Sequence, residues 1–163
     1  MIVTSKSKDI MNTDMHFGTP IYRIEKPEWV TKANKATDKY IKQAEKNLQP
    51  ELKERKKILG NKDYLKVKDH GLSYHSTPLN GDPNLIEIEK YIGATAWNLL
   101  DEWGYDMKLY TMFFTEFWVQ EFAKQGGGHH STHVHWDNHI SGFYFLKCNE
   151  KTSYPIFHDP RSG

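Results

Sequence analysis

Histidine is concentrated in one short stretch of this chain. Five of the nine histidines lie within residues 129–139. Side chains of an extended strand alternate between its two faces, so every second residue projects from the same side. In this stretch those residues are His133, His135, Asp137 and His139. Because imidazole and carboxylate groups together are ligands for Fe(II) and Zn(II), the spacing predicts a metal-binding strand.

The residues alone leave three interpretations open. A facial triad of two imidazoles and one carboxylate suits Fe(II) and leaves three cis positions for a bidentate 2-oxo acid and O₂. A zinc or cupin-type site would instead use His133, His135 and His139, since zinc prefers imidazole nitrogen. The third interpretation is a polar strand whose imidazoles are exposed or hydrogen-bonded. One strand supplies only two points of a triad, and His158 is the only later histidine that could add a third.

Length and composition describe one domain without a strong charge bias. The chain has 163 residues, of which 37% are hydrophobic and 13% aromatic, and this length suits a single domain with its own core. Lysine and arginine number 22 against 21 aspartates and glutamates, so charge gives no argument for nucleic acid. No apolar run approaches the roughly 20 residues of a membrane span, and the N-terminus lacks the apolar region of a signal peptide.

Cysteine usage bears on the compartment. Cys148 is the single cysteine, which excludes a disulfide within the chain and predicts a reducing cytoplasm. For a phage-encoded protein this would be the host cytoplasm. We expect Cys148 itself to be buried as a small apolar residue.

Two segments have the apolar spacing of helices. The first follows Pro27, which suits a first helical turn, and continues as a lysine-rich solvated face to Gly60. Its apolar positions are Val30, Ala33, Thr37, Tyr40, Ile41, Ala44 and Leu48. The second segment follows Asp82, a candidate cap, and ends before Gly104. Its stripe consists of Leu85, Ile88, Ile92, Ala96, Leu99 and Trp103.

Strands are predicted near the start of the chain and throughout its last third. Residues 17–24 read as a short strand, and residues 107–122 are rich in β-branched and aromatic side chains. A glycine loop that ends at Gly128 precedes the histidine strand, and further strands follow at 141–147 and 154–158. Helices followed by consecutive strands indicate an α+β domain with a helical layer outside a sheet.

Several motifs occur in an order that carries a resemblance. They are Thr19-Pro20-Ile21-Tyr22, Phe117-Trp118-Val119-Gln120, His133-Val134-His135, Ser141-Gly142-Phe143-Tyr144-Phe145 and Phe157-His158-Asp159-Pro160-Arg161. Together they resemble the Fe(II)/2-oxoglutarate-dependent oxygenases of the double-stranded β-helix fold, in the short group found in bacteria and phages. His135-Trp136-Asp137 is similar to the H-x-D triplet of the wider superfamily. The motifs span most of the chain, and residues 133–145 are the specific part.

The resemblance implies an activity and a set of site residues. His135 and Asp137 would bind Fe(II), and 2-oxoglutarate would chelate the metal as co-substrate. Tyr144 would hydrogen-bond the bound oxo acid or pack in the barrel wall. Decarboxylation of 2-oxoglutarate to succinate and CO₂ would be coupled to hydroxylation of an unidentified small-molecule or protein substrate. Related proteins continue into strands with a distal histidine and an arginine that anchors 2-oxoglutarate, so we expect both beyond Gly163.

The fold implied is an α+β double-stranded β-helix, a jelly-roll-like, cupin-type barrel with helices packed on one face. In a single domain of residues 1–163, we expect a loosely held tail at 1–15, a strand and helical layer at 16–104, and a β-core at 105–163. The barrel would be incomplete at its C-terminus, and its open edge would pair with a second copy or another partner. The alternatives to an oxygenase are a non-catalytic β-barrel module with a decayed site and a zinc or cupin-type metalloenzyme.

Overall fold

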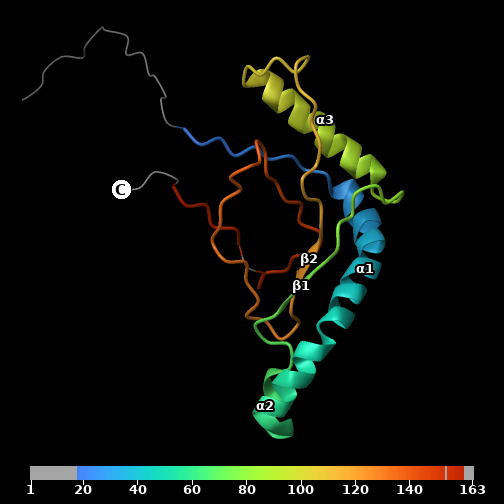
Figure 1. Cartoon of the computed structure of the whole chain (residues 1–163), viewed down its shortest axis with the longest axis vertical. Helices are drawn as coiled ribbons and strands as arrows, with labels where there is room; N and C mark the ends of the chain where they lie inside the picture. Colours follow the sequence, from blue (N-terminus) through green and yellow to red (C-terminus); the bar gives the residue numbers. More distant parts are fainter. Residues whose placement is uncertain (1–17, 153, 160–163) are drawn as a thin grey trace, which may run out of the picture.

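The computed structural model describes residues 18–152 and 154–159, and within them it contains three α-helices and one short sheet. The helices lie along one side of the molecule, and the irregular chain that follows α3 occupies the other side (Figure 1). In chain order the elements are the 3₁₀ helix η1 (Pro27–Trp29), α1 (Val30–Asn47), α2 (Gln49–Val67), β1 (Ser73–His75), α3 (Ile86–Glu102) and β2 (Gln120–Phe122).

Helix α1 confirms the first predicted helix. Pro27 opens the 3₁₀ turn that leads into it, where a missing backbone N–H costs nothing. One face of α1 is buried, and it consists of Ala33, Ala36, Thr37, Ile41 and Ala44. The Thr37 hydroxyl donates to the Ala33 carbonyl at 2.9 Å, so this buried polar group is satisfied inside the helix.

Helix α2 carries the lysine-rich segment and runs past the glycine that was predicted to close it. Gly60 lies inside α2 with φ +72° and ψ 163°, and it kinks the helix there because glycine adopts positive φ without a Cβ clash. Leu52 is the buried residue of α2, so most of the helix faces solvent as its charge pattern predicted. The helix ends at Val67, seven residues later than Gly60.

Helix α3 confirms the second predicted helix, and it buries Ile88 and Leu100. Asp82 does not cap it, because its Oδ1 accepts the Asn84 backbone N–H at 2.9 Å in the turn before the helix. The Asp82 carboxylate also pairs with Lys39 Nζ at 2.5 Å and accepts the Tyr40 hydroxyl at 2.8 Å. The hydrogen bond from Lys39, followed by those from Asn84 and Tyr40, holds the pKa of Asp82 far below its ordinary value. This buried carboxylate ties α1 to the entrance of α3.

The sheet consists of β1 paired antiparallel with β2, with Tyr74 opposite Glu121. Backbone hydrogen bonds continue beyond the strands, from Ser76 N–H to the Val119 carbonyl at 3.0 Å and from Leu79 N–H to the Phe117 carbonyl at 2.8 Å. The two chain segments therefore stay paired up to the edge of the core.

The hydrophobic core lies between the helical layer and the irregular chain. Its buried cluster consists of Ala33, Ala36, Leu79, Leu85 and Ile88. Side chains from both sides pack against this cluster, namely Trp29, Tyr40, Ile92, Phe117, Val119, Tyr144 and Leu146. The irregular chain thus contributes side chains to the core although it forms almost no sheet.

The predicted double-stranded β-helix is wrong. Within the described residues, β1 and β2 are the only strands, and each has three residues. The predicted strands at 133–139, 141–147 and 154–158 carry no strand assignment, and only Gln120–Phe122 of residues 107–122 does. Strand propensity measures how well a side chain fits a pleated, half-buried surface, and most aromatic side chains of these segments are exposed, among them Phe143, Phe145 and Tyr154.

Other expectations have mixed outcomes. Residues 18–24 form no strand, while Phe17, the rest of the predicted tail, and Pro160 and Arg161 lie outside the described residues. Cys148 is exposed, so the expected burial is wrong. Within the described ranges, no helix is both long enough and apolar enough to cross a bilayer. The division of the domain at residue 104 stays a prediction.

Candidate metal-binding site

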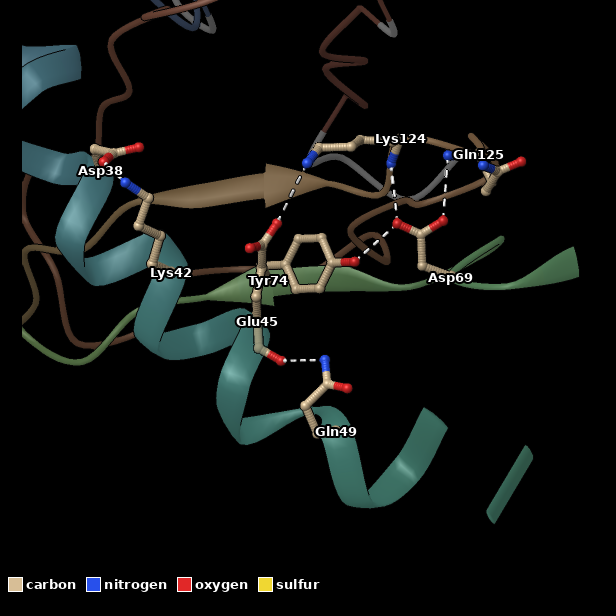
Figure 2. A network of polar contacts seen from close by, with 8 residues as sticks. All are labelled: Asp38, Lys42, Glu45, Gln49, Asp69, Tyr74, Lys124 and Gln125. Carbon is tan, nitrogen blue, oxygen red and sulfur yellow. Dashed lines mark hydrogen bonds and ion pairs between the residues drawn. The ribbon is translucent and has the colours of Figure 1, made fainter. Parts of the chain in front are cut away.

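The chain enters the histidine-rich stretch from β2 through a loop that Asp69 holds in place. Its carboxylate accepts hydrogen bonds from the Tyr74 hydroxyl at 2.8 Å, from Lys124 N–H at 3.2 Å and from Gln125 N–H at 3.3 Å (Figure 2). Burial acts to raise the pKa of Asp69, but the hydrogen bonds outweigh it and leave that pKa below its ordinary value. Burial and the contact with Asp69 raise the pKa of Tyr74. The carboxylate therefore stays ionised at neutral pH and fixes the start of the loop.

Glycines let this loop pass close to the chain before β1. Gly127 has φ +73°, and a Cβ on it would lie 2.8 Å from the imidazole of His70. A Cβ on Gly128 would lie 2.5 Å from the Leu72 carbonyl oxygen, which is closer than any real side chain approaches. The His70 Nδ1–H donates to the Gln125 carbonyl at 3.3 Å on the same side. The glycine run predicted as a loop thus sets where the histidines begin.

His133 and His135 bring two imidazole nitrogens together. Their Nε2 atoms are 3.2 Å apart, and the two rings meet edge to face. The His133 Nδ1 lies 2.7 Å from the Ser131 carbonyl, which can only accept, so Nδ1 carries the proton. In the neutral ring the lone pair is then on Nε2, the atom that faces His135. A hydrogen bond from the second ring nitrogen to a backbone carbonyl is the usual support of a metal-bound histidine.

The distance between the two Nε2 atoms suits one metal ion. With metal–nitrogen distances of about 2.0–2.1 Å and a ligand–metal–ligand angle of roughly 90–110°, two cis imidazole nitrogens lie about 2.8–3.4 Å apart. The observed 3.2 Å lies inside that interval. The two nitrogens are therefore close enough to occupy adjacent positions on one divalent ion, once the ion replaces the hydrogen bond that His135 Nε2–H donates to His133 Nε2.

Two more imidazoles and one indole extend the group, which we call the imidazole cluster (His75, Trp118, His130, His133 and His135). The His130 ring stacks on His133 with centroids 4.4 Å apart and lies 6.0 Å from the Trp118 ring. The His75 ring also contacts Trp118, with centroids 4.1 Å apart. Burial, and then the neighbouring imidazoles, lower the pKa of His130, which favours the neutral form that packing and metal binding both need.

Asp137 and His139 do not join the cluster. The Asn138 N–H donates to the His135 carbonyl at 3.3 Å, so the chain turns at Trp136 and Asp137. This turn breaks the alternation on which the predicted strand depended, and the prediction that His135 and Asp137 lie on one strand is wrong. His139 packs edge to face on Tyr105 at 5.5 Å. In the part of the chain that the structure describes, no three His, Cys, Asp or Glu side chains are grouped so that they could hold a metal ion.

Tyr144 belongs to the core side of the molecule. Its hydroxyl donates to the Lys26 carbonyl, and its ring packs against the buried cluster of α1 and α3. Burial raises the pKa of Tyr144, so the hydroxyl keeps its proton. Its role toward 2-oxoglutarate stays a prediction, and a bound oxo acid would have to compete with Lys26 for this donor. His158, the other candidate, is exposed.

The sequence argument missed His75, His130 and Trp118. His75 lies more than fifty residues before the histidine-rich stretch, and only the register that places His75 opposite Gln120 brings it near. His130 is an odd number of residues from His133 and His135, so in an extended strand its side chain would lie on the opposite face. It was therefore left out of the predicted metal site. Trp118 contacts imidazoles from two distant segments of the chain. Such contacts depend on the tertiary fold and leave no pattern in the neighbouring sequence.

The chain was compared with protein-family models, curated proteins and solved structures. No protein-family model, curated protein or solved structure matches this chain. The argument for metal binding therefore rests on the geometry of His133 and His135, and the argument for the oxygenase class rests on the motifs quoted above.

Proposed function

We propose that this chain binds a divalent transition metal ion through Nε2 of His133 and His135, and that it is an Fe(II)- and 2-oxoglutarate-dependent oxygenase. The observation that carries the metal site is the 3.2 Å separation of two nitrogens, one of which has its lone pair fixed by the Ser131 carbonyl. His133 thereby replaces Asp137 as the partner of His135. Two imidazoles are the donors that a borderline divalent ion accepts.

The chain itself would position and protect the metal. The Ser131 carbonyl holds the His133 ring in the metal-binding tautomer, and the stacked His130 limits the rotation of that ring. The glycine loop held by Asp69 sets the entry of the whole segment. Two protein ligands leave positions for water, a bidentate oxo acid and O₂. When bound, Fe(II) would supply the oxidation chemistry, while the protein supplies orientation.

Zinc binding is the second candidate, and one observation favours it. The grouped donors are all imidazoles, whereas the carboxylate of Asp137 lies in a turn outside the cluster. Zinc accepts such a donor set, and Fe(II) oxygenases use a carboxylate in their facial triad. The two candidates differ in co-substrate use, which separates them experimentally.

The test is anaerobic titration of the full chain with Fe(II), Co(II) and Zn(II), followed by an assay for succinate with 2-oxoglutarate and O₂. We expect metal binding in the wild type and a loss of about 10- to 100-fold in affinity for His133→Gln and for His135→Gln, since each change removes a ligand. His139→Gln is the matched control from the same loop and should bind normally.

The outcomes separate the candidates. Succinate release that needs O₂, Fe(II) and His135 supports the oxygenase. Tight zinc binding with no succinate release at any iron concentration would overturn the oxygenase and leave the zinc site. Metal affinity that is unchanged in both His133→Gln and His135→Gln would overturn the metal site itself.

A further inference from the structure

A pocket adjoins the imidazole cluster. Its walls include His75, the last residue of β1, Pro78, which follows β1, and Glu116, Phe117 and Trp118, which precede β2. Trp118 is shared between the pocket and the cluster, because its ring contacts His75 at 4.1 Å and lies 6.0 Å from the His130 ring. His130 in turn stacks on His133. A molecule in this pocket would therefore be linked to His133, one of the proposed metal ligands, through the rings of Trp118 and His130.

The pocket has one formal charge. Glu116 is the only Asp, Glu, Lys or Arg side chain among its lining residues. Its Oε2 accepts the Trp118 Nε1–H at 3.2 Å, which holds the carboxylate beside the indole ring. Within the described chain, Glu116 forms no ion pair with any Lys or Arg. An exposed carboxylate beside an aromatic ring is thus left to face the pocket.

These features fit a positively charged group at the end of an alkyl chain. A cation is attracted both by the carboxylate and by the face of an indole ring. Pro78 and Phe117 supply apolar surface on which an alkyl stem can lie while its charged end stays near water. An anionic ligand would meet the Glu116 carboxylate and be repelled. We propose that this pocket binds an alkylammonium group, and, resting on the proposed function, that the substrate of the oxygenase carries that group.

The test is an NMR titration of the metal-free full chain, followed at the indole Nε1–H resonance of Trp118. The cationic probe is Nα-acetyl-lysine N-methylamide, and its neutral counterpart is Nα-acetyl-norleucine N-methylamide. n-Butylammonium chloride represents a free amine. We expect the lysine probe to bind about three- to tenfold more tightly than the norleucine probe, the range for exposed ion pairs and cation–π contacts. Loss of one resonance in Trp118→Phe identifies the Trp118 signal.

Glu116→Gln keeps the shape of the side chain and removes its charge, so it should abolish most of this preference. Glu102→Gln, at the exposed end of α3, is the matched control and should keep it. Equal affinity for the lysine and norleucine probes, or an unchanged preference in Glu116→Gln, would overturn the cation site. Tighter binding of n-butylammonium than of the lysine probe, with the preference for lysine over norleucine retained, would support the site and identify a free amine as its ligand.

The experiment distinguishes failure of the amine pocket from failure of the proposed metal site. The metal-free titration does not involve His133 or His135, and His133→Gln should retain the preference for the lysine probe. Retained amine binding in a chain that binds no metal would overturn the assignment of the pocket to a substrate. Loss of amine binding in a chain that still binds metal would overturn the pocket and leave the metal site.

Discussion

Helix α1 and the histidine-rich loop are held in place by different kinds of interaction. In α1 each turn is closed by hydrogen bonds between residues four apart, and one face is buried, where Ala33 and Ala36 share a cluster with Leu79, Leu85 and Ile88. In the loop the backbone forms no ladder, and position depends on a few side-chain contacts such as His133 with the Ser131 carbonyl. The molecule therefore combines a packed helical layer with a loop whose geometry depends on single hydrogen bonds and ring contacts.

The difference has a consequence for function. The helical layer buries apolar side chains, so it supplies the free energy that keeps the chain folded. The loop leaves its imidazoles exposed, so they can exchange water or a ligand, and its order should respond to what binds there. Substitutions in the helical layer should therefore change the stability of the fold. Substitutions in the histidine-rich loop should change ligand binding.

The largest expected effect tests the helical side of this comparison. Leu85 is 2% exposed and lies in the buried cluster with Ile88. Leu85→Ala should lower the free energy of unfolding by about 2–5 kcal/mol, because it deletes buried methyl groups and leaves a cavity. Chemical denaturation followed by circular dichroism measures this. Phe143, which is 61% exposed, is the matched residue of the irregular side, and Phe143→Ala should change stability by less than about 0.5 kcal/mol.

The reverse order of these two effects would contradict the description of the core. It would show that the irregular chain, rather than the helical layer, carries the main buried apolar surface.

A smaller effect is expected at the contact that joins the two regions. Asp69→Asn removes the charge that holds Tyr74 and the loop, and should lower the free energy of unfolding by about 1.5–3 kcal/mol at pH 7, the range for hydrogen bonds to a charged group. The pKa of Asp69 in the folded state lies below its ordinary value, so the stabilisation by its charge is present above that ordinary value and is lost as pH falls through the folded pKa. The difference in free energy of unfolding between the wild type and Asp69→Asn should therefore decrease below about pH 4.

Asp63→Asn is the control for that experiment. Asp63 forms an exposed ion pair with Lys66 one turn later on α2, and such pairs contribute about 0–1 kcal/mol. If the difference in free energy of unfolding between the wild type and Asp69→Asn stays constant from pH 7 to about pH 2.5, the role given to the carboxylate charge is contradicted.

The helices could be predicted from sequence because their determinants are local. The spacing from Val30 to Ala44 predicted most of the face that α1 buries. For α3 the predicted stripe included Ile88 but not the buried Leu100, and Trp103 at its end is exposed. Gly60 interrupts α2 with a non-helical conformation, as its predicted role at a helix end requires, but the second helical segment up to Val67 was not predicted. Strand predictions failed for a physical reason: a strand needs a partner at the right register, and aromatic composition alone supplies none.

The candidate site was predicted only where its determinants are local in sequence. The alternation in His133-Val134-His135 brought out the two residues whose nitrogens converge. Asp137 was added by extending the alternation through Trp136, where the chain instead turns. His75 depends on the β1–β2 register, and Tyr144 on packing against α1, so neither position could be read from neighbouring residues.

The most direct test of the central claim is a long-range ¹H–¹⁵N NMR spectrum of the imidazoles of the full chain, recorded with and without one equivalent of Zn(II). The structure predicts that the Nε2 resonances of His133 and His135 shift together on metal addition while Nδ1 of His133 stays protonated against the Ser131 carbonyl. His139, packed on Tyr105, should not shift. Shifts at His139 without His133, or coordination through Nδ1 of His133, would contradict the proposed pair.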